Sequence, residues 1–122
     1  MSKLFCDVLD FDQNIGTWNV SKVTNMENMF ENASSFNNGG NNSIGTWNVS
    51  NVTNMGNMFE GAVLFNQPIG PWNVGKVINM SEMFRFAHFF NQQIGTWNVS
   101  NVKDMSFMFF EAFRFNNDGS TN

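Results

Sequence analysis

The chain has 122 residues, and its 42% hydrophobic content with 15 Phe and four Trp is ample for the core of one folded domain. Its ten acidic and six basic residues give a net charge of −4 and form no Lys/Arg cluster, which argues against nucleic-acid binding. The apolar runs are too short for a transmembrane helix, and the first residues lack the basic and apolar regions of a secretion signal.

A 25-residue unit recurs along almost the whole chain. The tryptophans at 18, 47, 72 and 97 are spaced 29, 25 and 25 residues apart, and the long interval contains four extra residues in the Asn/Gly-rich stretch 37–43. A fixed period of this length is typical of stacked repeats. We therefore expect a single domain over 1–122, with a partial repeat at 1–10, full repeats at 11–35, 36–64, 65–89 and 90–114, and a partial repeat at 115–122.

Each repeat predicts two short elements; position 1 is the phenylalanine that opens a full repeat, such as Phe11. Trp18 and Val20 alternate around a polar residue, which predicts a short strand. From residue 23 to residue 33, apolar residues recur at three- and four-residue intervals, which predicts a short helix. The expected fold is an α/β repeat solenoid of leucine-rich-repeat type, right-handed, with short parallel strands on one side and short helices on the other.

The recurring apolar residues form the predicted core. One repeat buries too little apolar surface to offset its ordering entropy, so stacking has to supply the remaining stability. The expected core residues are Trp18, Trp47, Trp72, Trp97, Met29, Met58, Met83, Met108, Phe30, Phe59, Phe84 and Phe109.

Asparagine recurs in phase with the unit, at positions 2, 9 and 15. A side-chain amide both donates and accepts hydrogen bonds, so asparagine at one phase can bond the backbone of its own turn and of the next repeat. The position-9 residues are expected to form a structural ladder. The alternative is a row of amides that faces a ligand. These residues are Asn19, Asn48, Asn73 and Asn98.

The last two repeats depart from the first two by becoming aromatic. Positions that hold Glu, Asn, Gly or Ser in the first two copies hold phenylalanine in the last two. An aromatic surface of this kind predicts a protein or self-association interface. The alternative is a cap that packs under the C-terminal end. The residues are Phe86, Phe89, Phe107, Phe110 and Phe113.

Few residues suggest chemistry. His88 is the only histidine and Cys6 the only cysteine, so neither has a partner of its own kind for a metal site or an internal disulfide. Cys6 is expected to be a partly buried thiol, with intermolecular pairing as the alternative. Asp7, Asp10 and Asp12 could attract calcium, but the other repeats replace Asp12 with Asn. We expect no enzymatic activity, no catalytic or metal site and no cofactor.

The complete unit, F-N-x-x-I-G-x-W-N-V-S-x-V-x-N-M-x-x-M-F-x-x-A, resembles the BspA-like leucine-rich-repeat family of mycoplasma-type surface lipoproteins. The W-N-V-S piece at 97–100 and the Met108-Phe109 pair carry this resemblance, which extends over essentially the whole chain. It implies a leucine-rich-repeat solenoid at the cell surface or in a secreted protein, with adhesion or partner binding. It brings no catalytic residues.

The leading functional prediction is a non-catalytic repeat scaffold for protein or surface recognition and adhesion. The alternative is a self-assembling, filament-type structural subunit joined through uncapped solenoid ends. Expected partners are a protein or cell-surface molecule, or further copies of the chain. Nucleic acid and a direct membrane span are not expected.

Overall fold

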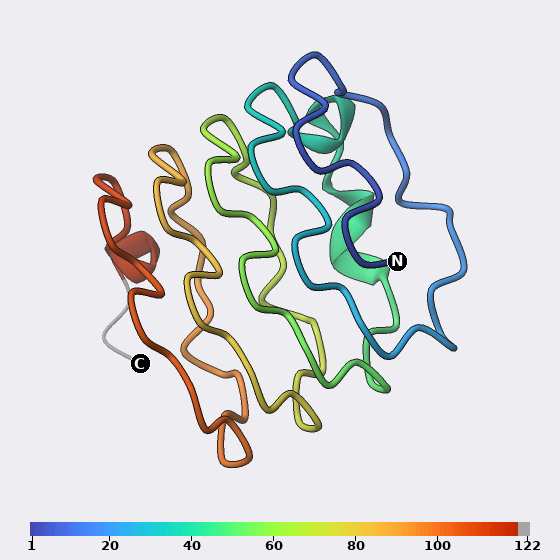
Figure 1. Ribbon diagram of the computed structural model, residues 1–122, viewed down its shortest axis with the longest axis vertical. Helices are drawn as coiled ribbons and strands as arrows, with labels where there is room; N and C mark the ends of the chain where they lie inside the picture. The colour runs from blue at the N-terminus through green and yellow to red at the C-terminus, as the bar shows by residue number, and fades with distance from the viewer. Residues whose placement is uncertain (120–122) are drawn as a thin grey trace.

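The computed structural model describes residues 1–119, so the last three residues of the partial repeat 115–122 lie outside the described part. Figure 1 shows the repeats side by side in chain order, from blue at the N-terminal end to red at the C-terminal end. The helical elements of the described chain are three short 3-10 helices: η1 (Asn38–Gly40), η2 (Asn42–Thr46) and η3 (Asn117–Gly119). The first two lie in the long second repeat.

The expected α/β solenoid of leucine-rich-repeat type is wrong. Residues 1–119 contain no β-strand and no α-helix, and consist mostly of turns and loops. Their β-type pairing is limited to isolated parallel bridges between position-15 residues of successive repeats. These bridges join Asn25 to Asn54, Asn54 to Asn79, and Asn79 to Asp104.

Left-handed residues prevent the predicted helices. In the first full repeat, Asn28 has φ 59° and Asn32 has φ 57°, and positions 18 and 22 have positive φ in the other repeats as well. A left-handed residue cannot continue a right-handed helix. The segment instead folds as successive turns, in which Met29 N–H donates to Met26 O at 3.2 Å. The three- and four-residue apolar spacing therefore arises from turns.

The other amides of these turns bond to the next repeat. Asn28 N–H donates to Gly56 O at 3.0 Å, Phe30 N–H to Met58 O at 2.9 Å, and Asn32 N–H to the carbonyl of residue 60 at 2.7 Å. The pattern recurs between each pair of neighbouring repeats. Within this segment the donor always belongs to the earlier repeat and the acceptor to the later one. Stacking thus satisfies backbone groups that an α-helix would satisfy internally.

The predicted W-N-V strand is replaced by a turn. Asn19 Oδ1 accepts the backbone N–H of Ser21 at 3.0 Å, and Val23 N–H donates to Val20 O at 2.9 Å. Both bonds lie within the repeat. The asparagine side chain thus accepts a backbone N–H that would otherwise be available to pair with a neighbouring strand. This bond from side chain to backbone is typical of an Asx turn.

The core contains two columns of stacked phenylalanine rings, which run through the repeats at positions 20 and 1. Along each column, ring centroids of neighbouring repeats are 5.4 to 6.0 Å apart. The two columns touch where one repeat leads into the next, as Phe30 and Phe36 do with ring centroids 4.1 Å apart. The columns are Phe5, Phe30, Phe59, Phe84 and Phe109, and Phe11, Phe36, Phe65, Phe90 and Phe115.

Most of the predicted core residues are buried. Among the tryptophans, Trp18 is the exception at 38% exposed, and Phe109 is partly exposed at the other end of the stack. The indole N–H of Trp47 donates to Ile15 O at 3.1 Å, and Trp72 and Trp97 repeat this bond one and two repeats further on. Each tryptophan from the second onward therefore fixes its repeat to the one before.

Glycine at position 6 permits the close stacking. A Cβ atom on Gly45 would lie 2.3 Å from Pro68 O, and one on Gly70 would lie 2.4 Å from Gln93 O. These distances leave no room for a side chain against a neighbouring backbone. The I-G-x-W motif is thus explained by contact between repeats.

Candidate functional site: the aromatic face

The five phenylalanines predicted as an interface lie at one end of the stack, in the last two full repeats. Phe107 is 62% exposed, Phe110 44% and Phe113 72%, whereas Phe86 and Phe89 are half-buried. We call these five residues the aromatic face. The structure brings all of them into contact with a neighbouring aromatic or cationic side chain.

Arg85 lies at the centre of three of these rings. Its guanidinium carbon is 4.8 Å from the ring centroid of Phe86, 5.4 Å from that of Phe110 and 5.9 Å from that of Phe107. The Phe110 ring meets Phe86 and Phe107 edge to face, with centroids 5.9 and 5.8 Å apart. Cation–π contacts and edge-to-face pairs favour a defined arrangement of these exposed side chains.

Glu82 orients Arg85. Its Oε2 accepts a hydrogen bond from the Arg85 guanidinium at 2.5 Å, and this bond raises the pKa of Arg85. Arg85 Nε has negligible solvent exposure and no acceptor among the described residues. Arg85 therefore stays charged, while one of its donors remains unpaired beside the rings.

A second cationic pair borders the face. The guanidinium carbon of Arg114 lies 4.2 Å from the Phe89 centroid, and the His88 ring stacks on Phe113 with centroids 4.9 Å apart. His88 thus packs against an aromatic ring. The sequence pattern did not single out Arg85 and Arg114, although each is next to a phenylalanine of the aromatic face in the sequence.

Two residues of the face have an unfavourable backbone conformation. Phe86 has φ 60° and Phe107 has φ 54°. The equivalent positions of the first two full repeats hold asparagine or glycine, which adopt this region readily. A bulky residue there costs roughly 1–2 kcal/mol. Asparagine and glycine at positions 18 and 22 were the sequence signal for this backbone.

The asparagines predicted as a ladder bond mainly within their own turns. Each accepts the backbone N–H two residues further on, at 3.0 to 3.1 Å, and the described chain shows no bond from these side chains to a neighbouring repeat. The four are Asn19, Asn48, Asn73 and Asn98.

A ladder between repeats exists at position 2 instead. The Oδ1 atom of each of the first four residues accepts the backbone N–H of its equivalent in the next repeat at 2.7 to 3.0 Å. The series runs through Asp12, Asn37, Asn66, Asn91 and Asn116.

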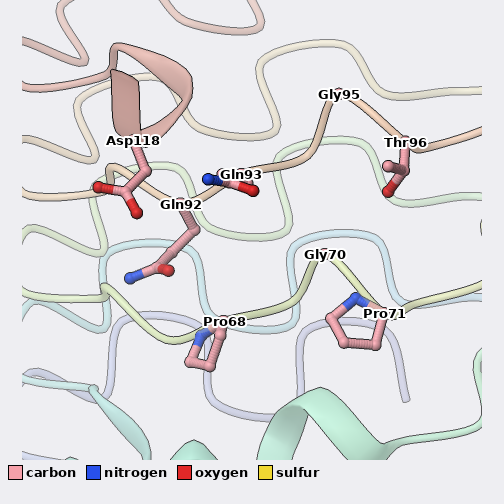
Figure 2. A pocket seen from close by; sticks show the side chains of 8 residues that line it. All are labelled: Pro68, Gly70, Pro71, Gln92, Gln93, Gly95, Thr96 and Asp118. Atoms are coloured by element: carbon pink, nitrogen blue, oxygen red, sulfur yellow. The ribbon is translucent and has the colours of Figure 1, made fainter. Parts of the chain in front are cut away.

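An open groove lies away from the aromatic face. Figure 2 shows Pro68 and Pro71 of one repeat beside Gln92 and Thr96 of the next, with Asp118 of η3 at one side. The hollow measures about 570 Å³ and adjoins a second of about 500 Å³ through the two prolines. Its lining of backbone, proline and amide groups offers a contact surface without paired acid and base groups.

The remaining candidate residues have structural surroundings. Asp12 Oδ1 accepts the N–H groups of Asn37 and Gly39 at 2.7 and 2.8 Å, so this oxygen already has two donors. Burial and the carboxylates of Glu31 and Asp7 raise the pKa of Cys6 to about 11. Within residues 1–119 no three His, Cys, Asp or Glu side chains gather as metal ligands. No helix in that range has the length and hydrophobicity to cross a membrane.

The comparisons with known proteins give one result. The family model described as "Mycoplasma protein of unknown function, DUF285" matches residues 1–42 and 37–122. No match is found among curated proteins or among solved structures. The matched segments cover the chain and support a mycoplasma-type repeat, without assigning it to the leucine-rich repeats.

Proposed function

Because this chain belongs to the DUF285 family of Mycoplasma proteins of unknown function, we propose a role from its surface: a non-catalytic recognition module that binds a protein partner through the aromatic face. The observation that carries the proposal is the exposure of Phe107 in a left-handed backbone position. Strain and apolar exposure both oppose the stability of the free protein. Residues that violate local preferences in this way cluster at functional sites.

The composition of the face favours a protein partner. Aromatic side chains and arginine are the residues most enriched at the energetic centres of protein interfaces. Here Phe107, Phe110 and Phe113 supply apolar area, while Arg85 supplies a fixed charge and an unpaired donor. A partner with an apolar side chain beside a carboxylate or carbonyl oxygen would complement both features.

Selection from a phage-displayed random peptide library tests this proposal. The target is the immobilised chain, compared with a variant carrying Phe107→Ser and Phe110→Ser. Ile78→Ser is the matched control, because Ile78 is 45% exposed and lies outside the aromatic face. We expect enriched peptides that bind the wild type and the control at least about tenfold more tightly than the double variant. Peptides that bind all three proteins equally would overturn the proposal.

The setting that we propose is the cell surface or the secreted fraction, as in the BspA-like surface proteins that the repeat resembles. Adhesion is then the broader role of partner binding. The proposed setting is supported by the resemblance of the repeat sequence to that family, and a shared leucine-rich-repeat fold is no part of this support. Protease treatment of intact cells tests it: degradation of the protein while a cytoplasmic marker survives is the expected result, and equal survival of both would contradict a surface setting.

A further inference from the structure

The groove lies between two segments of similar sequence and structure. The first is Asn-Asn-Gly-Gly at 37–40, which contains η1, and the second is Asn-Asn-Asp-Gly at 116–119, which contains η3. Asn42, just after the first segment, lines one hollow of the groove, and Asp118 lines the other. Figure 1 shows η1 and η2 in teal and green and η3 in red, and the third and fourth full repeats between them contain no such helix.

Both segments cover the backbone of the preceding repeat. Asn38 Oδ1 accepts the N–H of Ile15 at 2.8 Å, and the equivalent asparagine of η3 accepts the N–H of Ile94 at 2.7 Å. A Cβ atom on Gly39 would lie 3.2 Å from Asn14 N, so the first segment rests directly on that backbone. The surface formed by positions 3 to 5 of a repeat thus already accepts polypeptide at two places in the chain.

The groove leaves backbone donors of the same surface unpaired. In the first full repeat, Asn14 Oδ1 accepts the N–H of Gly16 at 2.9 Å. The third and fourth full repeats have proline and glutamine in place of this asparagine. The N–H groups of Gly70 and Gly95 have no acceptor within residues 1–119. Both glycines line the groove in Figure 2, and Gly95 is exposed while Gly70 is partly exposed. These two donors are therefore available to an outside acceptor.

We propose that the groove binds an extended peptide segment of a partner protein, whose carbonyl oxygens accept the N–H groups of Gly70 and Gly95. An amide oxygen is the acceptor that this surface uses within the chain, and a peptide carbonyl is the same chemical group. Main-chain hydrogen bonds of this kind hold extended peptides on other proteins with unpaired backbone groups. The site is separate from the aromatic face and does not depend on it.

The spacing of the two donors suits an extended chain. Ring centroids of neighbouring repeats are 5.8 to 6.0 Å apart along the column from Phe36 to Phe115. Carbonyl groups on one side of an extended peptide recur every second residue, about 6.6 Å apart. The two periods differ by under about 1 Å over the single step from Gly70 to Gly95, which a twisted strand absorbs. The three steps from η1 to η3 span roughly 18 Å, which is room for about five extended residues.

The lining of the groove favours a particular peptide composition. Asp118 is the one charged side chain among the described residues that line it, so a basic peptide residue at that end is favoured and an acidic one is opposed. Pro68 and Pro71 line both hollows and offer an apolar surface to an aliphatic or aromatic side chain. The expected ligand is therefore an extended segment without acidic residues, in which an apolar residue lies near a lysine or arginine.

Two substitutions that pair the donors inside the chain test this proposal. Pro68→Asn and Gln93→Asn, made together, place in both repeats the asparagine that the first full repeat has at this position. The new side-chain oxygens should accept the N–H groups of Gly70 and Gly95, as in the first repeat. Thr17→Asn is the matched control, because it adds an asparagine at an exposed residue outside the groove.

The probe is a synthetic library of N-acetylated, C-amidated hexapeptides, screened against the wild-type chain. Peptides that bind the Phe107→Ser and Phe110→Ser double variant equally well are kept, which removes ligands of the aromatic face. We expect the kept peptides to bind the wild type and Thr17→Asn at least about tenfold more tightly than the double asparagine variant, since that variant withdraws two hydrogen-bond donors. Equal binding to all three proteins would refute the site. A screen that yields no such peptide, or binding of a neutral oligosaccharide such as maltohexaose instead, would also refute it.

Nuclear magnetic resonance spectra of the wild-type chain give a second measurement that needs no variant. A bound peptide should move the amide proton resonances of Gly70 and Gly95 downfield, because each gains an acceptor. The resonance of Gly16 should stay in place, because its N–H is already paired with Asn14. Unchanged resonances of Gly70 and Gly95 in the presence of a bound peptide would contradict the proposed contacts.

Discussion

At the scale of single residues, the left-handed positions distinguish residues that suit the local backbone from residues that do not. Asn28 and Asn57 occupy position 18 in two earlier repeats, where a short polar side chain tolerates positive φ. Phe107 occupies the same position with φ 54° and is 62% exposed. Its side chain gains little from burial in the free chain to offset the backbone strain.

Phe107→Asn should therefore stabilise the free protein by about 0.5–1 kcal/mol, because relief of left-handed strain outweighs the loss of an exposed ring. The free energy of unfolding in urea measures this change. Phe110→Asn is the control, because Phe110 is also exposed but has no left-handed backbone. A loss of more than about 1 kcal/mol in Phe107→Asn would show that its contacts with Arg85 and Phe110 stabilise the chain more than the strain opposes it.

Cys6 provides a second prediction at this scale. Burial, followed by the charges of Glu31 and Asp7, raises the pKa of the thiol from 9.0 to about 11. Only the thiolate reacts with iodoacetamide, so the alkylation rate should keep rising up to about pH 11. Glu31→Gln should shift the midpoint of this profile to lower pH. A midpoint near 9 in the unaltered chain would contradict the surroundings described for Cys6.

The sign of the linked stability change follows from the same shift. Between pH 9 and about 11 the unfolded thiol loses its proton while the folded thiol keeps it. The contribution of Cys6 to stability is thus fully present below pH 9 and is lost as the pH rises through this window.

At the scale of elements, the sequence predicts the buried residues better than the backbone conformation. The period of the tryptophans indicates the length of the repeat, and most of the predicted apolar positions are buried. The strand and helix predictions failed for a physical reason. Apolar residues three or four apart face one side both in a helix and in a run of successive turns, so periodicity alone cannot separate the two.

The decisive signal was present at Asn28 and Gly61, which occupy the left-handed positions that interrupt a helix.

The aromatic face could be predicted from the sequence only in part. Its five phenylalanines were visible as departures from the repeat, because they replace polar or small residues. The role of Arg85 depends on distances across two repeats and could not be read from one segment.

Gly45 gives a prediction about the contact between elements. Gly45→Ala would place Cβ 2.3 Å from Pro68 O, so the repeats would have to separate. Overpacking against backbone costs about 1–3 kcal/mol, which we expect as a loss of unfolding free energy in urea.

Gly75→Ala is the control, because its Cβ would meet side-chain atoms rather than backbone: Asn73 Oδ1 at 3.1 Å and Asn98 Nδ2 at 4.0 Å. A change within about 0.5 kcal/mol is expected there. Equal losses in the two variants would mean that contact with Pro68 is not what requires glycine at residue 45.

At the scale of the whole molecule, the one-way hydrogen bonds of the turn segments give the stack an electrical polarity. In positions 16 to 22 every inter-repeat N–H points toward the C-terminal end and every accepting carbonyl toward the N-terminal end. Peptide dipoles aligned in this way add along the stack axis, with the positive pole at the C-terminal end. An α-helix has the opposite sense, with its positive pole at the N-terminus. Each repeat in the stack adds to this dipole, so a stack of more repeats should orient more strongly in an applied electric field.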